Sequence, residues 1–155
     1  MPIATADPLL YLDDLRVGQR FANGATYALD AAHIRSFAAD YDPQPFHLDD
    51  GAARATLFGG LAASGWHTAA ITMRLLVQGG LPLAGGIVGA GSEVQWPRPT
   101  RPGDVLAVES EVLEIAPSRS KPDRGIVTVR SETRNQRGEV VQVTTSRLVV
   151  FRRQP

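Results

Sequence analysis

Asp42 and His47 have side chains suited to acid/base chemistry, and both lie in the segment that reads DPQPFHLDD from Asp42 onwards. An unperturbed histidine titrates near pH ~6.5, so it can accept or donate a proton at neutral pH, and a nearby carboxylate can orient water or complete a proton relay. Loop aspartates more often cap or turn the chain, however, and histidines more often satisfy local hydrogen bonds. Spacing alone leaves both interpretations open.

Ser64 and Gly65 form a second candidate, because they fall near the start of a long apolar run. The first N–H groups of a helix lack intrahelical partners, and the helix dipole is positive there, so such a place can hold an oxyanion. Glycine also lets a carbonyl approach the main chain, and one preorganised donor of this kind typically lowers a barrier by ~3 kcal/mol. By residue type alone, a role in tight helix–sheet packing is favoured.

The first third of the chain is expected to place Asp42 at the end of a helix. Residues 17–29 surround an Asn-Gly turn signal and predict a short hairpin or a bent strand. Asp30 can cap a helix that stops by Asp42, because Pro43 and Pro45 disfavour helical continuation. The segment from Pro43 to about Phe58 is expected to be extended or turning.

The remaining chain predicts one buried helix and an antiparallel sheet. Residues 60–78 form the longest apolar element, and an apolar helix in a globular protein must be enclosed. Four strand-like segments follow, with connections too short for crossover helices, and two of them alternate apolar and polar residues. The fold class is therefore α+β, with the sheet wrapped around the central helix. The four segments are 85–96, 104–115, 125–135 and 139–151.

Composition excludes several classes of function. The 155 residues contain 16 basic and 16 acidic side chains, so nucleic-acid and anionic-membrane surfaces have little support. There is no cysteine, which removes disulfides, thiolate metal sites and cysteine nucleophiles. We expect a flexible arm over 1–8, a single domain over 9–155, and a cytoplasmic location, since the first residues are not typical of a signal peptide and no apolar run would span a bilayer.

Four segments, in order, resemble the MaoC-like acyl dehydratases, relatives of the (R)-specific enoyl-CoA hydratases with a hot-dog fold. The resemblance spans about 15–151, and the family's hydratase motif has the form Asp-x-Asn-Pro-x-His. Asp42, Pro45 and His47 match this motif, whereas Gln44 stands where the family has Asn. Gly65 corresponds to the glycine of the family's oxyanion hole. The four segments read FAADYDPQPFHLDD, FGGLAASGWHTAA, VQWPRPTRPGDVL and NQRGEVVQ.

The resemblance implies a hydro-lyase that adds water to a trans-2-enoyl-CoA or removes it from a 3-hydroxyacyl-CoA. Asp42 and His47 would activate the water and deliver a proton to C2, and the Gly65 N–H would receive the charge on the thioester oxygen. No cofactor and no metal would be needed, and we expect a homodimer or larger, with the pocket at the subunit boundary. The implied substrate-binding residues are Gln44, Pro45, Phe46, Ser64 and Trp66.

Two other functions remain open at this point. Hot-dog domains also host acyl-CoA thioesterases, and fold alone does not exclude that reaction. A non-catalytic acyl-thioester-binding module is the third hypothesis, and Gln44 in place of Asn is its best support.

Three further features have simpler interpretations. The glycine order of 86–91 is reversed relative to a dinucleotide-binding motif, so these glycines are expected in a strand pressed on the helix. His67 is expected to be a hydrogen-bonded helix residue rather than part of the pocket, and Trp66 to be core or interface. Five basic residues have side chains that suit coenzyme A phosphates, although most such charges are only solvated: Arg98, Arg101, Arg119, Lys121 and Arg124.

Overall fold

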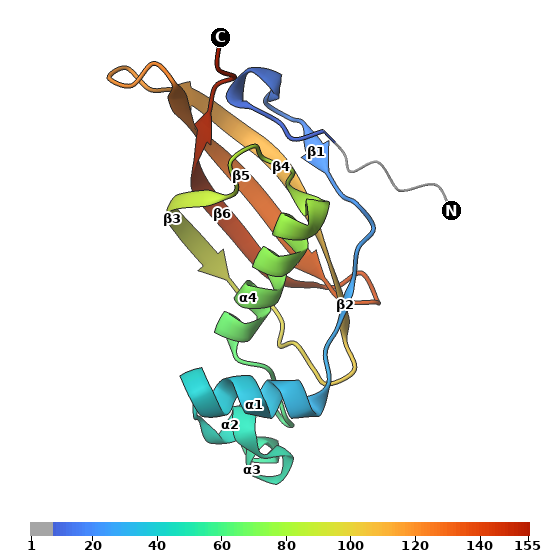
Figure 1. The fold of residues 1–155 in the computed structure, drawn as a ribbon. Coiled ribbons are helices and arrows are strands. Elements are labelled where there is room, and N and C mark those ends of the chain that lie inside the picture. The colour runs from blue at the N-terminus through green and yellow to red at the C-terminus, as the bar shows by residue number, and fades with distance from the viewer. Residues whose placement is uncertain (1–7) are drawn as a thin grey trace.

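The structure is a computed structural model that describes residues 8–155. The arm predicted over 1–8 therefore lies outside the described residues except for Pro8, and it stays a prediction. An antiparallel sheet packs against one central helix, and three other helices gather at one end of the sheet (Figure 1). This arrangement is the predicted α+β fold with a sheet around a central helix.

The sheet has the strand order β1-β4-β5-β6-β3, and β2 also pairs with β4. Its long strands alternate as predicted, because the residues of β4 and β5 that were expected to face the helix are buried. The short strands β1 and β2 each pair with β4 and not with each other, so the bent strand is confirmed and the hairpin is wrong. The strands are β1 (Arg20–Phe21), β2 (Tyr27–Ala28), β3 (Val88–Gln95), β4 (Val105–Pro117), β5 (Arg124–Arg134) and β6 (Val140–Phe151).

The central helix α4 spans Gly65–Leu75, five residues later at its start than the prediction from residue 60. Residues 60–64 are not helical, because their N–H groups bond to other segments: the Ala62 N–H donates to the Phe46 carbonyl, and the Ala63 N–H donates to the Thr100 carbonyl. Ser64 then caps the helix, with its hydroxyl accepting from the Trp66 N–H at 3.2 Å. The core that α4 shares with the sheet consists mainly of leucine, isoleucine and valine.

The far end of α4 closes in a π turn over Leu76–Gly80. Gly79 has φ +117°, a backbone angle that favours glycine, and an added Cβ would lie 2.7 Å from the Asn23 amide nitrogen. That amide donates to the Gln78 carbonyl at 3.0 Å. The Asn-Gly signal at residue 23 therefore ties the first strands to the end of the central helix.

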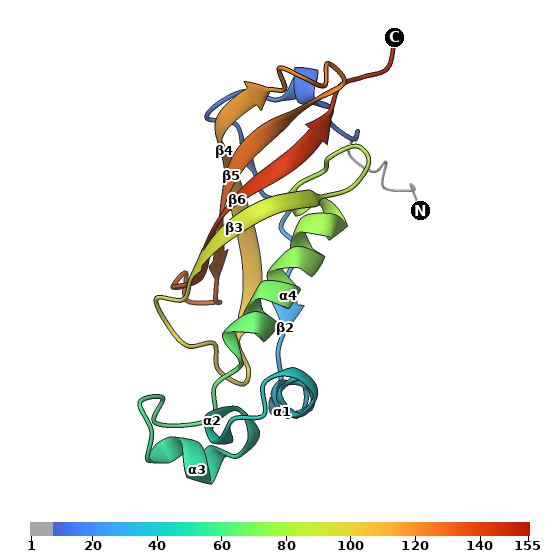
Figure 2. The same cartoon turned by 90° about the vertical axis from the view of Figure 1, so that its left-hand side faces the viewer.

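Helix α1 (Ala31–Tyr41) ends at Asp42, as predicted. The following segment is not the loop that was expected, because it contains α2 (Pro45–Leu48) and α3 (Asp50–Arg54). Pro45 starts the first of these short helices, where its missing N–H would have no intrahelical partner, and the Asp49 carboxylate caps the second by accepting from the Ala52 N–H at 2.8 Å. Helices α1, α2 and α3 form a layer next to the start of α4 (Figure 2).

Residues 8–155 leave one face of α4 uncovered, which contradicts the expectation that the apolar helix is fully enclosed. Trp66, Met73 and Val77 lie seven and then four residues apart, so they share a side of the helix, and all three are exposed. The sheet can cover only the opposite side of a rod-shaped helix. Trp66 is thus not a core residue.

Candidate active site

Asp42 and His47 come together because α1 ends at one of them and α2 carries the other. The Asp42 Oδ2 atom lies 3.3 Å from the His47 Nε2 atom, and both side chains are largely buried. The two prolines of this segment end α1 and begin α2, so the chain reverses within a few residues. The pair expected from the sequence is therefore within hydrogen-bonding reach.

The orientation of the His47 ring is fixed by a contact at Nδ1, the nitrogen that does not face Asp42. Its Nδ1 atom lies 2.7 Å from the Ala62 carbonyl oxygen, and a carbonyl oxygen can only accept a hydrogen bond. The proton of a neutral His47 must therefore be on Nδ1, which leaves the Nε2 lone pair free beside Asp42. An edge-on contact with the Phe46 ring, 4.6 Å between ring centroids, holds the imidazole from the side. Nε2 is thus prepared to accept a proton.

Two neighbours hold the Asp42 carboxylate. The Ser64 hydroxyl donates to Oδ2 at 2.7 Å, and the Gln44 amide donates to Oδ1 at 2.5 Å. Burial raises the pKa of the Asp42 carboxyl, but the hydrogen bonds from Ser64 and Gln44 and the nearby His47 outweigh burial, so the pKa lies below its ordinary value. Asp42 is therefore ionised at neutral pH. Gln44 supplies the side-chain amide despite standing where the family motif has Asn.

Gly65 is the first residue of α4, so its N–H has no acceptor within the helix. An added Cβ would lie 2.6 to 2.8 Å from three atoms of the Trp96 indole, a distance that real Cβ atoms essentially never show. Glycine is therefore required here by the close packing of Trp96. The packing interpretation of Gly65 is thus confirmed, and because Gly65 also lines the cavity described next, its oxyanion role stays a prediction.

A cavity of about 520 Å³ opens in front of these residues. Asp42, His47 and Gly65 contribute its polar end, and much of the remaining wall is apolar, as expected of a site for a small organic ligand. Trp66 and Trp96 meet edge to face beside Gly65, with ring centroids 5.2 Å apart. The other lining residues are Leu57, Phe58, Ala63, Thr68, Pro97, Arg98, Pro99 and Thr100.

Of the five predicted substrate-binding residues, only Trp66 lines this cavity. Gln44 and Ser64 are turned toward Asp42, and the Phe46 ring is turned toward His47 and Phe58. Pro45 is used at the first position of α2. These four residues do not line the cavity in this structure but contact residues that do, and their predicted role in substrate binding stays a prediction.

The sequence reasoning missed the wall formed by 96–100. Trp96 is anchored from below, since its Nε1–H donates to the Gln142 Oε1 atom at 2.9 Å, and Gln142 is fully buried. The Gln142 amide donates in turn to the Thr72 hydroxyl at 3.1 Å, which pairs with Thr133 at 2.6 Å. The aromatic-proline run before the Pro-Gly-Asp turn was the only available signal, because the anchoring residues lie far away in sequence.

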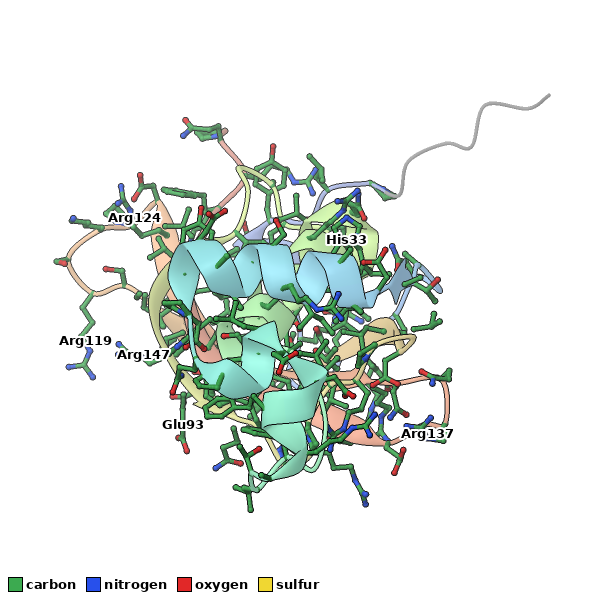
Figure 3. The ribbon with its side chains drawn as sticks, turned by 90° about the horizontal axis from the view of Figure 1, so that it is seen from below. His33, Glu93, Arg119, Arg124, Arg137 and Arg147 are labelled. Atoms are coloured by element: carbon green, nitrogen blue, oxygen red, sulfur yellow. The ribbon has the colours of Figure 1, made fainter. Side chains whose placement is uncertain are left out.

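Only one of the five basic residues suggested for phosphate binding lines the cavity, namely Arg98. Arg101 instead donates to the backbone carbonyls of Phe58, Gly60 and Leu61, which fixes the chain before α4. The loop between β4 and β5 lies at the end of the sheet away from α1 (Figure 1). Arg119 on this loop and Arg124 at the start of β5 point outward at the edge of the molecule in Figure 3, and neither lines the cavity.

His67 differs from its expected role. Its side chain does not line the cavity, as predicted, but its Nδ1 atom is buried without a hydrogen-bond partner. The expected side-chain hydrogen bond is therefore absent at Nδ1.

Comparisons with known proteins identify the family. The family model described as the MaoC like domain matches residues 14–135. The chain belongs to the MaoC-like domain family. The crystal structure of the MaoC-like dehydratase from Rhodospirillum rubrum matches this chain with a TM-score of 0.92 and a sequence identity of 66%. The match covers 94% of this chain and 99% of that chain. The antiparallel sheet around α4 is therefore the hot-dog fold of a MaoC-like domain.

Two curated relatives of this MaoC-like domain are more distant. The uncharacterized protein YdeM of Bacillus subtilis is 34% identical over 129 residues, which is 81% of this chain and 88% of YdeM. The 3-hydroxybutyryl-CoA dehydratase of Methylorubrum extorquens is 31% identical over 115 residues, which is 73% of this chain and 70% of that protein. Between residues 8 and 155, none of the helices is long and apolar enough to cross a membrane. The cytoplasmic location stays a prediction.

Proposed function

We propose that the protein adds water to trans-2-enoyl-CoA thioesters and, in the reverse direction, dehydrates 3-hydroxyacyl-CoA thioesters. The observation that carries the proposal is the Asp42–His47 pair, 3.3 Å between Oδ2 and Nε2, lining the same cavity as the first N–H of α4. Membership of the MaoC-like family and the similarity to a 3-hydroxybutyryl-CoA dehydratase support the same reaction class.

In the proposed hydration, one water molecule lies against Asp42 and His47. The free Nε2 lone pair of His47 and the ionised Asp42 carboxylate together withdraw a proton from this water as its oxygen bonds to C3. The 2,3 double bond is lost, and negative charge moves to the thioester oxygen, where the Gly65 N–H and the positive end of α4 stabilise it. The pair then returns the proton to C2, so that one water is added and no net proton is released.

The reaction needs no cofactor and no metal, because the thioester itself stabilises the charge next to C2. Trp66, Phe58 and Trp96 offer an apolar surface for the acyl part of the substrate, and Arg98 is the cation at the cavity wall. These roles extend the proposal from the reacting atoms to the whole substrate.

We further propose that two copies pair through the uncovered face. Trp66 and Met73 on α4 and Val77 in the π turn after it expose an apolar stripe, and β3 is an edge strand of the sheet, pairing with β6 alone among residues 8–155. Unpaired edges and exposed apolar stripes are costly in water, and a second copy would cover both. The contact between Trp66 and Trp96 would bring this surface next to the cavity.

The experiment follows the conjugated-thioester absorbance of trans-2-enoyl-CoA substrates together with release of free thiol. Hydration removes the absorbance without releasing thiol, hydrolysis releases thiol, and a binding module does neither. Asp42→Asn and His47→Ala should each abolish hydration while leaving the unfolding transition cooperative. Wild-type turnover in either folded variant contradicts the assigned pair, and thiol release by the wild-type protein contradicts the reaction.

A further inference from the structure

His67 is a buried histidine that the proposed mechanism does not use. It lies in the first turn of α4, two residues after Gly65, and only 7% of its surface is exposed. Its Nδ1 atom has no hydrogen-bond partner among residues 8–155. Leaving a buried polar atom unpaired costs free energy, and burying a charged ring without a partner costs more.

The His67 ring takes part in an aromatic stack. The His67 ring lies parallel to the Phe37 ring, with 4° between the planes and 4.4 Å between the centroids. Phe37 is in α1, one turn before that helix ends at Asp42. The stack therefore links the helix that ends at the carboxylate to the helix that begins at the oxyanion-binding N–H.

Besides this stack, a hydrogen bond joins the end of α1 to the start of α4. The Ser64–Asp42 hydrogen bond fixes the carboxylate oxygen but leaves the direction of α1 to packing. The Phe37–His67 stack is one turn back along α1, so the two contacts together define how the end of α1 meets the start of α4. Because a misplacement of 1 Å can slow a reaction by about 100-fold, this placement matters for catalysis.

We propose that His67 is a positioning residue, which holds Asp42 at its place opposite Gly65 through its stack with Phe37, in a buried site that has no acceptor at Nδ1 and so disfavours protonation of the ring. This inference rests on the proposed function for its kinetic consequences, whereas the stack and the burial of the unpartnered Nδ1 atom stand on the structure alone.

The surroundings explain why the ring must be neutral. Burial lowers the pKa of the His67 imidazolium below its ordinary value, and the charge of His33 acts in the same direction. His33 lies one turn before Phe37 on α1 and pairs with Asp30 at 3.0 Å. The other ionisable side chain of α4 is Arg74, which lies two turns away over the Tyr27 ring. The remaining ionisable side chains of α1 are Arg35, Asp40 and Tyr41, and none of them is a hydrogen-bond partner of the His67 Nδ1 atom.

The sign of the pH dependence follows from this lowered pKa. In the unfolded chain His67 binds a proton below pH ~6.5, while in the folded protein it resists protonation. Its contribution to stability is therefore complete above pH ~6.5 and is lost as the pH falls toward the lower folded-state pKa. Within that window, each unit by which the pH falls raises the unfolding equilibrium constant by up to about tenfold through His67 alone.

The test compares His67→Phe, which keeps a flat ring but cannot titrate, with His67→Leu, which loses the flat ring. At pH 8, His67→Phe should keep a kcat close to wild type, and His67→Leu should lower kcat by about 10- to 100-fold with little change in KM, because His67 does not line the cavity. Phe37→Leu, which breaks the stack from its other side, should reproduce the His67→Leu effect. Denaturant unfolding between pH 8 and pH 5 should show a shallower pH slope for His67→Phe than for wild type.

Equal pH slopes for wild type and His67→Phe, or an unchanged kcat in His67→Leu, would overturn the inference. Should His67→Phe fail to fold, NMR titration of the three histidines of the wild-type protein decides the protonation step, because His67 must titrate below its ordinary range. If the wild-type protein hydrates no enoyl-CoA, the proposed function fails, and the unfolding slopes and the titration still test the neutral stack independently.

Discussion

Ser64→Ala removes a hydroxyl that makes two connections at the centre of the site. The hydroxyl accepts from the Trp66 N–H as the cap of α4 and donates to the Asp42 carboxylate at 2.7 Å. Losing a serine cap typically costs about 1 kcal/mol, and losing a hydrogen bond to a charged group costs about 1.5 to 3 kcal/mol. Because the Asp42 carboxylate also lines the cavity, we take the lower bound for the second contribution. The expected loss is about 2 to 3 kcal/mol in the free energy of unfolding.

The same substitution should shift the pH dependence of activity. The Ser64 hydrogen bond is one of the contacts that hold the pKa of the Asp42 carboxyl below its ordinary value, so its removal raises that pKa. The stability that a carboxyl with a lowered pKa contributes is present above its unfolded value and is lost as the pH falls through the folded one. The acid limb of kcat/KM should therefore move toward neutral pH, and the stability difference between variant and wild type should narrow in acid.

Denaturant unfolding at neutral and acid pH and the pH profile of enoyl-CoA hydration measure both effects. Asp30→Ala is the matched control, since Asp30 caps α1, a helix of the same 11-residue length as α4, and accepts from the His33 N–H. The control should lose a cap without moving the acid limb. An unmoved acid limb in Ser64→Ala, or a stability loss no greater than that of the control, would refute the reasoning.

Three other substitutions test the architecture around the site. Gly65→Ala should lower the free energy of unfolding by about 1 to 3 kcal/mol in a denaturant titration, because the new Cβ meets the Trp96 indole. Gly51→Ala should cause no such loss, because its Cβ would make only an ordinary 3.4 Å contact. Equal stabilities of the two variants would contradict the close packing at Gly65. Gln142→Leu should lower the free energy of unfolding by about 1 to 3 kcal/mol, because it leaves the Trp96 Nε1–H unpaired. Fluorescence quenching should show a more accessible Trp96 indole. Unchanged quenching would contradict a role of Gln142 in holding Trp96. Met73→Asp should prevent self-association in sedimentation experiments, whereas Leu113→Asp, a charge placed on β4, should not; a dimer that survives Met73→Asp would disprove the proposed interface.

Local rules accounted for much of the fold. Alternating residues in β4 and β5 identified the buried face, since side chains point to opposite sides of a strand whatever its neighbours are. Asp30 and Pro43 located both ends of α1, because caps and prolines act on the backbone within a few residues. Long-range contacts decided the start of α4, where Ala63 bonds to Thr100, and no local signal at residue 60 reports that bond.

The sequence by itself determined the chemical types at the site. Asp42 and His47 are five residues apart in a proline-containing segment, which supplied an acid/base pair of side chains but left their contact open. The resemblance to the MaoC-like family added Gly65 to the predicted catalytic residues, whereas its residue type alone favoured a role in helix–sheet packing.

Only the tertiary structure decided which atoms face one another. The Ala62 carbonyl sets the protonated nitrogen of His47, and Ser64 sets the charge of Asp42. Gln142, some 46 residues from Trp96, fixes the wall of the cavity. Each of these is a directional contact between segments distant in sequence, and hydrogen bonds depend on distance and angle that composition and spacing do not contain.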